Sequence, residues 1–283
     1  MASPPAPLVS VAWLLRAVDE GSLRVLDCRW TLGVGPRADL YLRGHLPGAV
    51  FIDLEQALAG PPGAAGRHPL PHPALFQAAM RRAGVGPDTC VVAYDEGTGA
   101  AARCWWLLRA AGHAEAAVLD GGVAAWVEAG GPLVTSVSRP SPGGLTVTGF
   151  SGTVTADVVA RLAAAAGSRR AAVLDARAPE RYRGELEPVD PRAGHIPGSR
   201  NLSFGELFPA GRLLESDALA ATLDAAGVDP SAPPVVYCGS GITACMVLLA
   251  LAVAGVEGGR LYPGSWSEWS QDPAHPVAIG PDP

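Results

Sequence analysis

The segment "VVYCGSGITACM", Val235 to Met246, begins as an apolar β-like run, passes through a loop with two glycines and continues as an apolar helix-like run. A strand followed by a loop and a helix is typical of a parallel α/β sheet. Such sheets bind ligands at the carboxyl ends of their strands. Cys238 stands where this strand should end, so the segment predicts an α/β fold with a thiol at a functional position.

The first half of the chain repeats the pattern of the second half. The segment "RVLDCRW" (Arg24 to Trp30) matches "AVLDARA" (Ala172 to Ala178). Further along, "RGHLPGAVFIDL" (Arg43 to Leu54) matches "AGHIPGSRNLSF" (Ala193 to Phe204). Matching segments lie about 150 residues apart, and a repeat of this length indicates a duplicated domain rather than a solenoid.

Each copy alternates short β-branched runs with longer helical patterns, which predicts two tandem domains, each a parallel sheet flanked by helices. Residues 135–152 are rich in serine, proline and glycine and show no helical periodicity, so we expect a linker there. The predicted domains are therefore residues 1–134 and residues 153–283.

The two copies differ at the position of the loop cysteine. When Tyr94 is aligned with Tyr237, Asp95 stands opposite Cys238. A carboxylate cannot act as a sulfur nucleophile, so we expect a catalytic second domain and a non-catalytic first domain. The alternative is that Cys238 is an ordinary core cysteine, but the glycines on both sides of Ser240 favour a functional loop.

The loop itself suits a reactive thiolate. Gly239 and Gly241 permit positive φ angles, which let several backbone N–H groups turn toward the centre of the loop. These donors and the amino end of the following helix stabilise negative charge. We therefore predict that Cys238 is a nucleophile.

The composition excludes several other functions. All 21 lysine and arginine positions are arginine, which excludes a Schiff-base lysine and a Walker-type phosphate loop. The net charge of −6 argues against general nucleic-acid binding. Five cysteines without a C-x-x-C pair argue against a disulfide framework and a structural zinc site. The apolar run 244–256 is shorter than the ~20 residues of a membrane span. We expect a cytoplasmic protein that uses no membrane.

With the tandem copies, "CGSGITA" (Cys238 to Ala244), "RYRG" (Arg181 to Gly184) and "GSWSEW" (Gly264 to Trp269), the chain resembles the rhodanese-family sulfurtransferases. In this family, thiosulfate enzymes usually carry an Arg-Lys pair after the cysteine, whereas 3-mercaptopyruvate enzymes carry Cys-Gly-Ser-Gly-Val-Thr-Ala. The resemblance implies that 3-mercaptopyruvate is the preferred sulfur donor.

The resemblance also implies a ping-pong mechanism through a persulfide on Cys238. Ser240 would hydrogen-bond the donor carbonyl and pass a proton. The backbone of the active-site loop would stabilise the persulfide; its residues are Gly239, Ser240, Gly241, Ile242, Thr243 and Ala244. The outer sulfur would pass to a thiol acceptor, such as thioredoxin or a low-molecular-weight thiol, or to cyanide. No metal or organic cofactor is implied.

The same resemblance proposes residues that bind the donor. Arg181 matches an arginine that binds the donor carboxylate. The second such arginine of the family lies in "EPR", but this chain reads "EPVDPRAGH", with Val189 at that place, so Arg192 is the candidate substitute. His45 is a candidate because family members can place a first-domain histidine beside the loop serine. His195 occupies the same motif in the other copy, which favours a turn-stabilising role instead.

Two other functions stay open from the sequence. One is a thiosulfate sulfurtransferase with a divergent loop. The other is a non-enzymatic persulfide carrier or thiol sensor, which needs a reactive Cys238 but neither turnover nor Arg181.

Asp27 and Asp175 are each followed two residues later by an arginine, and this duplication predicts scaffold ion pairs.

Overall fold

The computed structural model describes residues 4–18, 23–165 and 172–283. The chain divides into two compact units. Unit 1 comprises Met1–Gly60, Leu70–Ser151 and Ala210–Arg212; unit 2 comprises Pro61–Pro69, Gly152–Pro209 and Leu213–Pro283. Each unit therefore contains a short segment from the other half of the chain.

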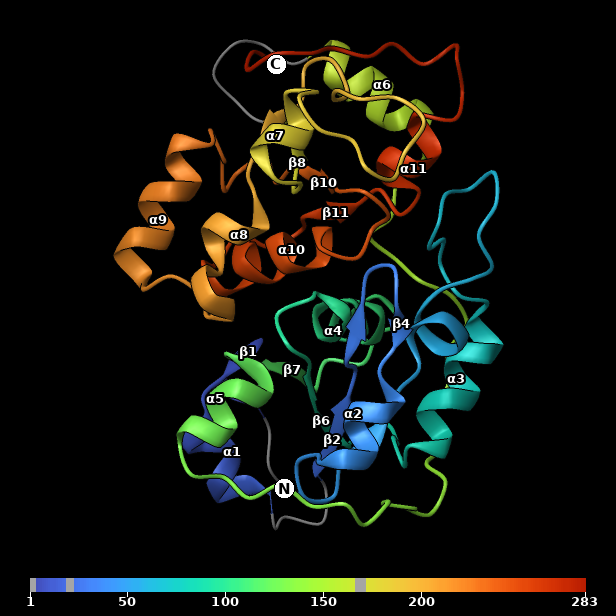
Figure 1. The fold of residues 1–283 in the computed structure, drawn as a ribbon, viewed down its shortest axis with the longest axis vertical. Coiled ribbons are helices and arrows are strands. Elements are labelled where there is room, and N and C mark those ends of the chain that lie inside the picture. The colour runs from blue at the N-terminus through green and yellow to red at the C-terminus, as the bar shows by residue number, and fades with distance from the viewer. Residues whose placement is uncertain (1–3, 19–22, 166–171) are drawn as a thin grey trace. The chain divides into compact units, whose positions relative to one another are not determined.

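Unit 1 is built on a parallel sheet with the strand order β1-β7-β6-β2-β5 (Figure 1). The strands in that order are Leu8–Val9, Ala116–Leu119, Cys90–Tyr94, Leu23–Asp27 and Val50–Phe51. Every residue of the central strand β6 is buried, as expected for a strand covered on both faces. A small antiparallel pair, β3 (Trp30–Thr31) and β4 (Gly35–Pro36), lies outside this sheet.

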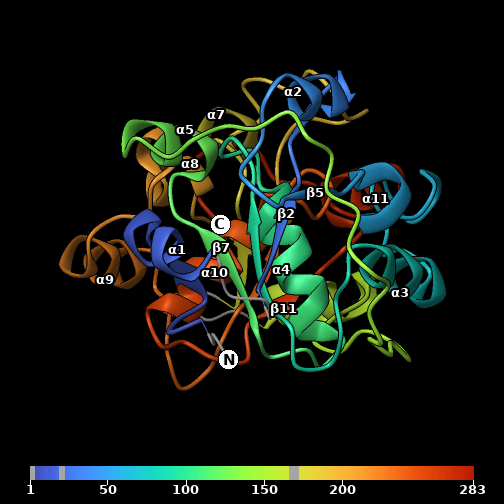
Figure 2. The same cartoon turned by 90° about the horizontal axis from the view of Figure 1, so that it is seen from below.

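Helices cover both faces of the unit 1 sheet. They are α1 (Val11–Ala17), α2 (Ala38–Arg43), the π-helix η1 (Leu54–Leu58), α3 (Pro73–Arg82), α4 (Ala100–Ala110) and α5 (Gly122–Glu128). Leu14 of α1 and Trp126 of α5 share one core cluster with β2, β6 and β7. Figure 2 shows α4 lying along the strands, and most of its side chains are buried. The sheet is thus enclosed by apolar helix faces.

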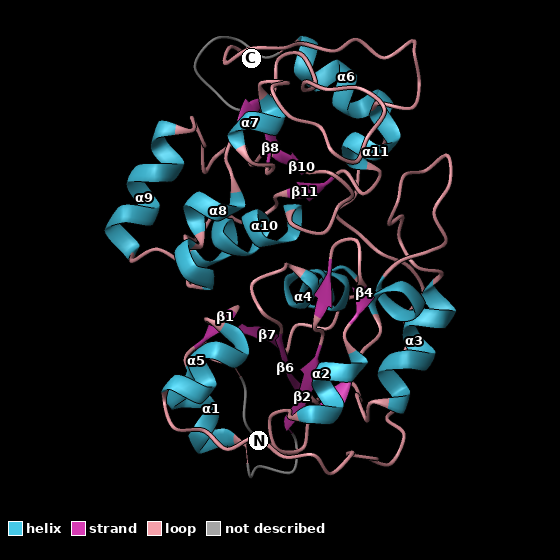
Figure 3. Ribbon diagram, viewed as in Figure 1, coloured by secondary structure: helices cyan, strands magenta, loops and turns pink. Residues whose placement is uncertain are grey.

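Unit 2 repeats this plan with a parallel sheet in the order β11-β10-β8-β9 (Figure 3). The strands in that order are Arg260–Leu261, Val235–Tyr237, Val173–Asp175 and Arg200–Asn201. The helices are α6 (Ala156–Ala164), α7 (Pro179–Tyr182), α8 (Phe204–Leu207), α9 (Ser216–Ala225), α10 (Ala244–Val253) and α11 (Ser265–Trp269). The 3₁₀ turn η2 (Pro209–Gly211) follows α8 and contains the point where the chain passes from unit 2 to unit 1. The prediction of two α/β domains with parallel sheets is confirmed.

The duplicated Asp-x-Arg residues form buried ion pairs, as predicted. Arg29 Nη2 lies 2.6 Å from Asp27 Oδ2, and Arg177 Nη2 lies 2.6 Å from Asp175 Oδ2. Each arginine also donates to a glycine carbonyl of its own unit. Buried charges of this kind are tolerated only when paired and hydrogen-bonded. The pairs fix the carboxyl ends of β2 and β8, where each sheet presents its loops.

The duplicated histidines occupy equivalent turns. His45 stacks on Tyr41 and its Nδ1 lies 2.7 Å from the Tyr41 carbonyl oxygen. His195 stacks on Tyr182 and its Nδ1 lies 2.8 Å from the Tyr182 carbonyl oxygen.

In the described part of the chain, no helix has the length and apolar character that crossing a membrane requires.

Candidate active site

Cys238 lies directly after β10, at the carboxyl end of the central strand of unit 2, and only 2% of its surface is exposed. The first residues of α11 hold the loop that follows Cys238. Ser265 Oγ accepts from the Cys238 N–H at 3.2 Å, and the N–H groups of Trp266 and Ser267 donate to the carbonyls of Cys238 and Gly239 at 2.9 Å. The thiol therefore lies where the end of β10 is hydrogen-bonded to the start of α11.

The loop directs a donor at the sulfur. The Gly241 N–H donates to Cys238 Sγ at 3.1 Å. Gly241 has a φ of +77°, a conformation that favours glycine. Thr243 follows as the N-cap of α10, and Ile242 and Ala244 are buried. The loop and the start of the helix thus direct backbone N–H groups toward the position of the Cys238 sulfur, an arrangement that favours negative charge there.

A histidine contacts the loop serine. His68 Nδ1 lies 2.7 Å from Ser240 Oγ, and Ser240 is 6% exposed. His68 belongs to the first half of the sequence, but its segment, Pro61–Pro69, is part of unit 2. Gly66 lies so close to Gly264 that a β-carbon on it would be 2.6 Å from the Gly264 carbonyl oxygen. This close approach positions the histidine beside the serine.

Two guanidinium groups border the same loop. A β-carbon at Gly239 would lie 3.1 Å from Arg67 Nη2 and 3.4 Å from Arg181 Nη1. Arg67 is oriented through its own N–H, which donates to Ser267 Oγ at 3.0 Å. Arg181 comes from α7, which follows the scaffold ion pair at the end of β8. The absence of a side chain at Gly239 leaves room for both cations next to Cys238.

Two carboxylates neutralise these cations. Arg181 Nη2 lies 2.6 Å from Glu187 Oε1 and 3.2 Å from Asp190 Oδ2. Arg67 Nη1 pairs with Asp190 Oδ1. Burial raises the pKa of Asp190, although the neighbouring Arg67 opposes that shift. The cluster combines two cations and two anions beside the nucleophile position.

Two residues proposed from the resemblance are engaged elsewhere. Arg192 donates to four backbone carbonyls, those of Trp269, Ser270, Asp272 and His275, at 2.6 to 3.0 Å. It therefore anchors the C-terminal segment. His45 belongs to unit 1, and both ring nitrogens lie within hydrogen-bond distance of carbonyls there. The histidine that contacts Ser240 is His68.

Asp95, which aligns with Cys238, closes its own loop in unit 1. Its carboxylate accepts from the N–H groups of Gly97 at 2.8 Å and Ala101 at 3.0 Å. Burial raises the pKa of Asp95, and these N–H groups counteract the shift. The carboxylate thus caps the start of α4.

Within residues 4–18, 23–165 and 172–283, no three histidine, cysteine or acidic side chains are grouped as metal ligands would be.

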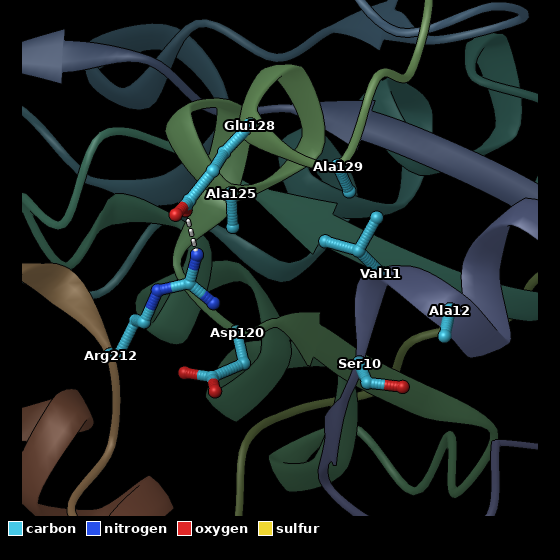
Figure 4. Close-up of a pocket in the computed structure, with 8 residues that line it drawn as sticks. All are labelled: Ser10, Val11, Ala12, Asp120, Ala125, Glu128, Ala129 and Arg212. Carbon is cyan, nitrogen blue, oxygen red and sulfur yellow. Dashed lines mark hydrogen bonds and ion pairs between the residues drawn. The ribbon is translucent and has the colours of Figure 1, made fainter.

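Sequence reasoning missed Arg67, His68 and Asp190. The one available signal is a short match, "AGRH" (Ala65 to His68) with "AGRL" (Ala210 to Leu213). The second of these segments also crosses: Ala210–Arg212 is part of unit 1. There Arg212 packs against Gly121, pairs with Glu128 and lines a pocket of about 350 Å³ (Figure 4). Each half of the sequence therefore contributes one short segment to the unit formed mainly by the other half.

The rhodanese-like domain description matches residues 10–129 and 156–272. The chain therefore belongs to the rhodanese-like family. Two relatives are 44% identical, and both carry provisional names. One, from Mycobacterium tuberculosis, is named a thiosulfate sulfurtransferase (277 residues; 96% of this chain, 97% of that one). The other, from Pseudomonas aeruginosa, is named a 3-mercaptopyruvate sulfurtransferase (290 residues; 97% and 99%).

A solved structure shows the same architecture. The crystal structure of SseA from Escherichia coli is described as showing the rhodanese fold of 3-mercaptopyruvate sulfotransferases. It superposes with a TM-score of 0.80 at 34% identity, over 93% of this chain and 100% of that one. The predicted family and enzyme class, a rhodanese-family sulfurtransferase, are confirmed.

Proposed function

We propose that this enzyme takes a sulfur atom from 3-mercaptopyruvate onto Cys238 and passes it to a thiol or to cyanide. The observation that carries the proposal is the arrangement at the loop: Cys238 Sγ accepts from the Gly241 N–H, and two guanidinium groups lie beside Gly239. The loop provides a stabilised sulfur nucleophile, and the cations provide a place for an anionic donor.

In the first half-reaction, the Cys238 thiolate attacks the sulfur of the donor. A sulfur–sulfur bond forms, the carbon–sulfur bond breaks, and pyruvate leaves as its enolate with the electron pair. Ser240 Oγ–H, in contact with His68 Nδ1, supplies the proton that converts the enolate to pyruvate. The persulfide stays at Cys238, with the Gly241 N–H beside its inner sulfur, Sγ.

The donor carboxylate binds through Arg181, whose planar guanidinium suits bidentate contact with a carboxylate. In the second half-reaction, an acceptor thiolate attacks the outer sulfur and Cys238 leaves as the thiolate. Thioredoxin, a low-molecular-weight thiol and cyanide are the acceptors that this chemistry allows. In this proposal only unit 2 is catalytic, because Asp95 replaces the nucleophile in unit 1.

Thiosulfate is the second candidate donor. Two guanidiniums beside Gly239 can pair with a dianion, and the relative from Mycobacterium tuberculosis is named for thiosulfate. The loop from Gly239 to Ala244 carries no charge of its own, however, and this favours the monoanionic carboxylate of 3-mercaptopyruvate.

The test measures sulfur transfer to cyanide from both donors at equal concentration, with Cys238→Ser and Cys245→Ser as matched variants. We expect a higher kcat/KM with 3-mercaptopyruvate and complete loss of transfer only in Cys238→Ser. Mass spectrometry after donor addition should show one extra sulfur atom on the Cys238 peptide. A higher kcat/KM with thiosulfate would overturn the donor assignment. Persulfide formation without turnover would instead favour the carrier function.

A further inference from the structure

Asp190 occupies an unusual position beside the loop. Its side chain is 3% exposed, and it contacts both Arg67 and Arg181. Its own N–H donates to Glu187 Oε1 at 3.0 Å, which fixes the turn that carries it. The Asp190 carboxylate accepts hydrogen bonds from two guanidinium groups, and an anionic ligand would make the same kind of contact.

The charges in this cluster are already balanced. Arg67 and Arg181 supply two positive charges, and Glu187 and Asp190 supply two negative charges. Glu187 is further committed to Arg177 at 3.3 Å and to two backbone N–H groups. Within the described residues, the Asp190 carboxylate accepts only from Arg67 and Arg181. Asp190 is therefore the acid that can yield its contacts at the smaller cost.

Arg67 has donors to offer to a ligand. Its Nε is buried and finds no acceptor within the described residues, and its Nη2 faces Gly239. A buried N–H without an acceptor is costly, so a ligand oxygen that reaches it gains that lost hydrogen bond. At the position where an arginine was expected from the resemblance, the chain has Val189, followed directly by the acid.

We propose that Asp190 is an internal competitor of the sulfur donor: its carboxylate holds the Arg67 and Arg181 contacts that the donor anion takes, and it selects against donors of higher negative charge. This inference rests on the proposed function. A donor that enters the cluster must displace Asp190 from the guanidiniums or bind against its charge. A dianion meets a larger repulsion than a monoanion.

The kinetic test compares Asp190→Asn with Glu185→Gln, a control that removes a carboxylate from the exposed Arg183 pair of the same segment. We expect Asp190→Asn to lower KM for 3-mercaptopyruvate about tenfold and to lower KM for thiosulfate by a larger factor. The double variant Arg67→Gln/Asp190→Asn should lose this gain. An unchanged or higher KM in Asp190→Asn, or the same change in Glu185→Gln, would overturn the proposal.

A second measurement needs no turnover. Iodoacetate and iodoacetamide both alkylate Cys238, but only iodoacetate carries a carboxylate. The ratio of the two alkylation rates reports the local cations and cancels changes in thiolate reactivity. We expect the ratio of the iodoacetate rate to the iodoacetamide rate to be higher in Asp190→Asn than in the wild type. In the double variant the ratio should be lower than in Asp190→Asn. The same ratio in all three proteins would contradict the role of Asp190. Failure of sulfur transfer from both donors, with a normal alkylation ratio, would instead count against the proposed function.

Thermal unfolding of each variant shows whether it is folded. If Asp190→Asn does not fold, the alkylation test compares the double variant Arg67→Gln/Asp190→Asn with the single variant Arg67→Gln. The double variant removes one positive and one negative charge together. The double variant should then react faster with iodoacetate than Arg67→Gln, because only the single variant retains the uncompensated Asp190 charge. Equal rates would overturn the proposal.

Discussion

At the scale of single residues, the proposed mechanism uses the contact between His68 and Ser240 to bring a proton to the leaving group. The 2.7 Å separation lets the imidazole accept from the hydroxyl or donate to it as the reaction requires. The Gly241 N–H is the donor that faces Cys238 Sγ, whereas His68 faces the hydroxyl of Ser240. In the proposed mechanism the pair therefore transfers the proton and orients the donor carbonyl.

This assignment predicts that Ser240→Ala and His68→Gln each lower kcat for 3-mercaptopyruvate about a hundredfold, with a small change in KM. The two residues act as one unit, so the double variant should be no slower than either single variant. Steady-state kinetics measure this, with His72→Gln, an exposed N-cap of α3, as the histidine control. A normal kcat in His68→Gln, or additive losses in the double variant, would refute the assignment.

At the scale of elements, the loop between β10 and α10 depends on left-handed backbone at Gly241. A β-carbon there costs about 1 kcal/mol or more through the positive φ. Gly255, which follows α10, has nearly the same φ, +78°, and a β-carbon on it would meet no atom within 4 Å. The two glycines thus share a conformation but differ in place, one beside the sulfur and one at the far end of the helix.

We expect Gly241→Ala and Gly255→Ala to lower the free energy of unfolding by similar amounts, about 1 kcal/mol each. Only Gly241→Ala should slow persulfide formation, because a shift of its N–H removes the hydrogen bond to Cys238 Sγ. Urea unfolding and single-turnover alkylation or sulfur uptake measure the two effects. Equal activity in both variants would show that the loop tolerates the shift and that this N–H is not required.

At the scale of the whole molecule, each unit contains a buried histidine whose neutral form is favoured. Burial lowers the pKa of His113 in unit 1 and of His195 in unit 2 below the ordinary value of 6.5. The unfolded chain therefore takes up these protons first as the pH falls. The contribution of each histidine to stability is present above its unfolded pKa and is lost as the pH falls from there through its lower folded pKa.

The melting temperature should accordingly fall between about pH 8 and about pH 5. In His113→Gln the fall should be shallower, because one of the two histidines no longer contributes. His72→Gln serves as the control, since His72 is exposed. The acidic residues are the same in every variant, so comparing slopes removes their contribution. Equal slopes for wild type and His113→Gln would contradict this account.

The duplication, the α/β class and the position of Cys238 at the end of a strand could all be predicted from the amino-acid sequence. These follow from local patterns: strand–helix alternation, the glycines of the loop, and the contrast between Asp95 and Cys238 in equivalent places. The scaffold pairs Asp27–Arg29 and Asp175–Arg177 were equally predictable, because the same Asp-x-Arg pattern stands at the same place in both copies. Local geometry alone carries this information.

Only the tertiary structure brought Arg67, His68 and Asp190 to the loop and assigned Arg192 to the C-terminal segment. The segment Pro61–Pro69 is packed with unit 2 although it lies in the first repeat, and backbone propensity does not say which unit a loop joins. Arg192 was proposed from its place in the chain, but four carbonyls were its nearest acceptors. Contacts between residues distant in sequence depend on packing, and packing is decided by the whole fold.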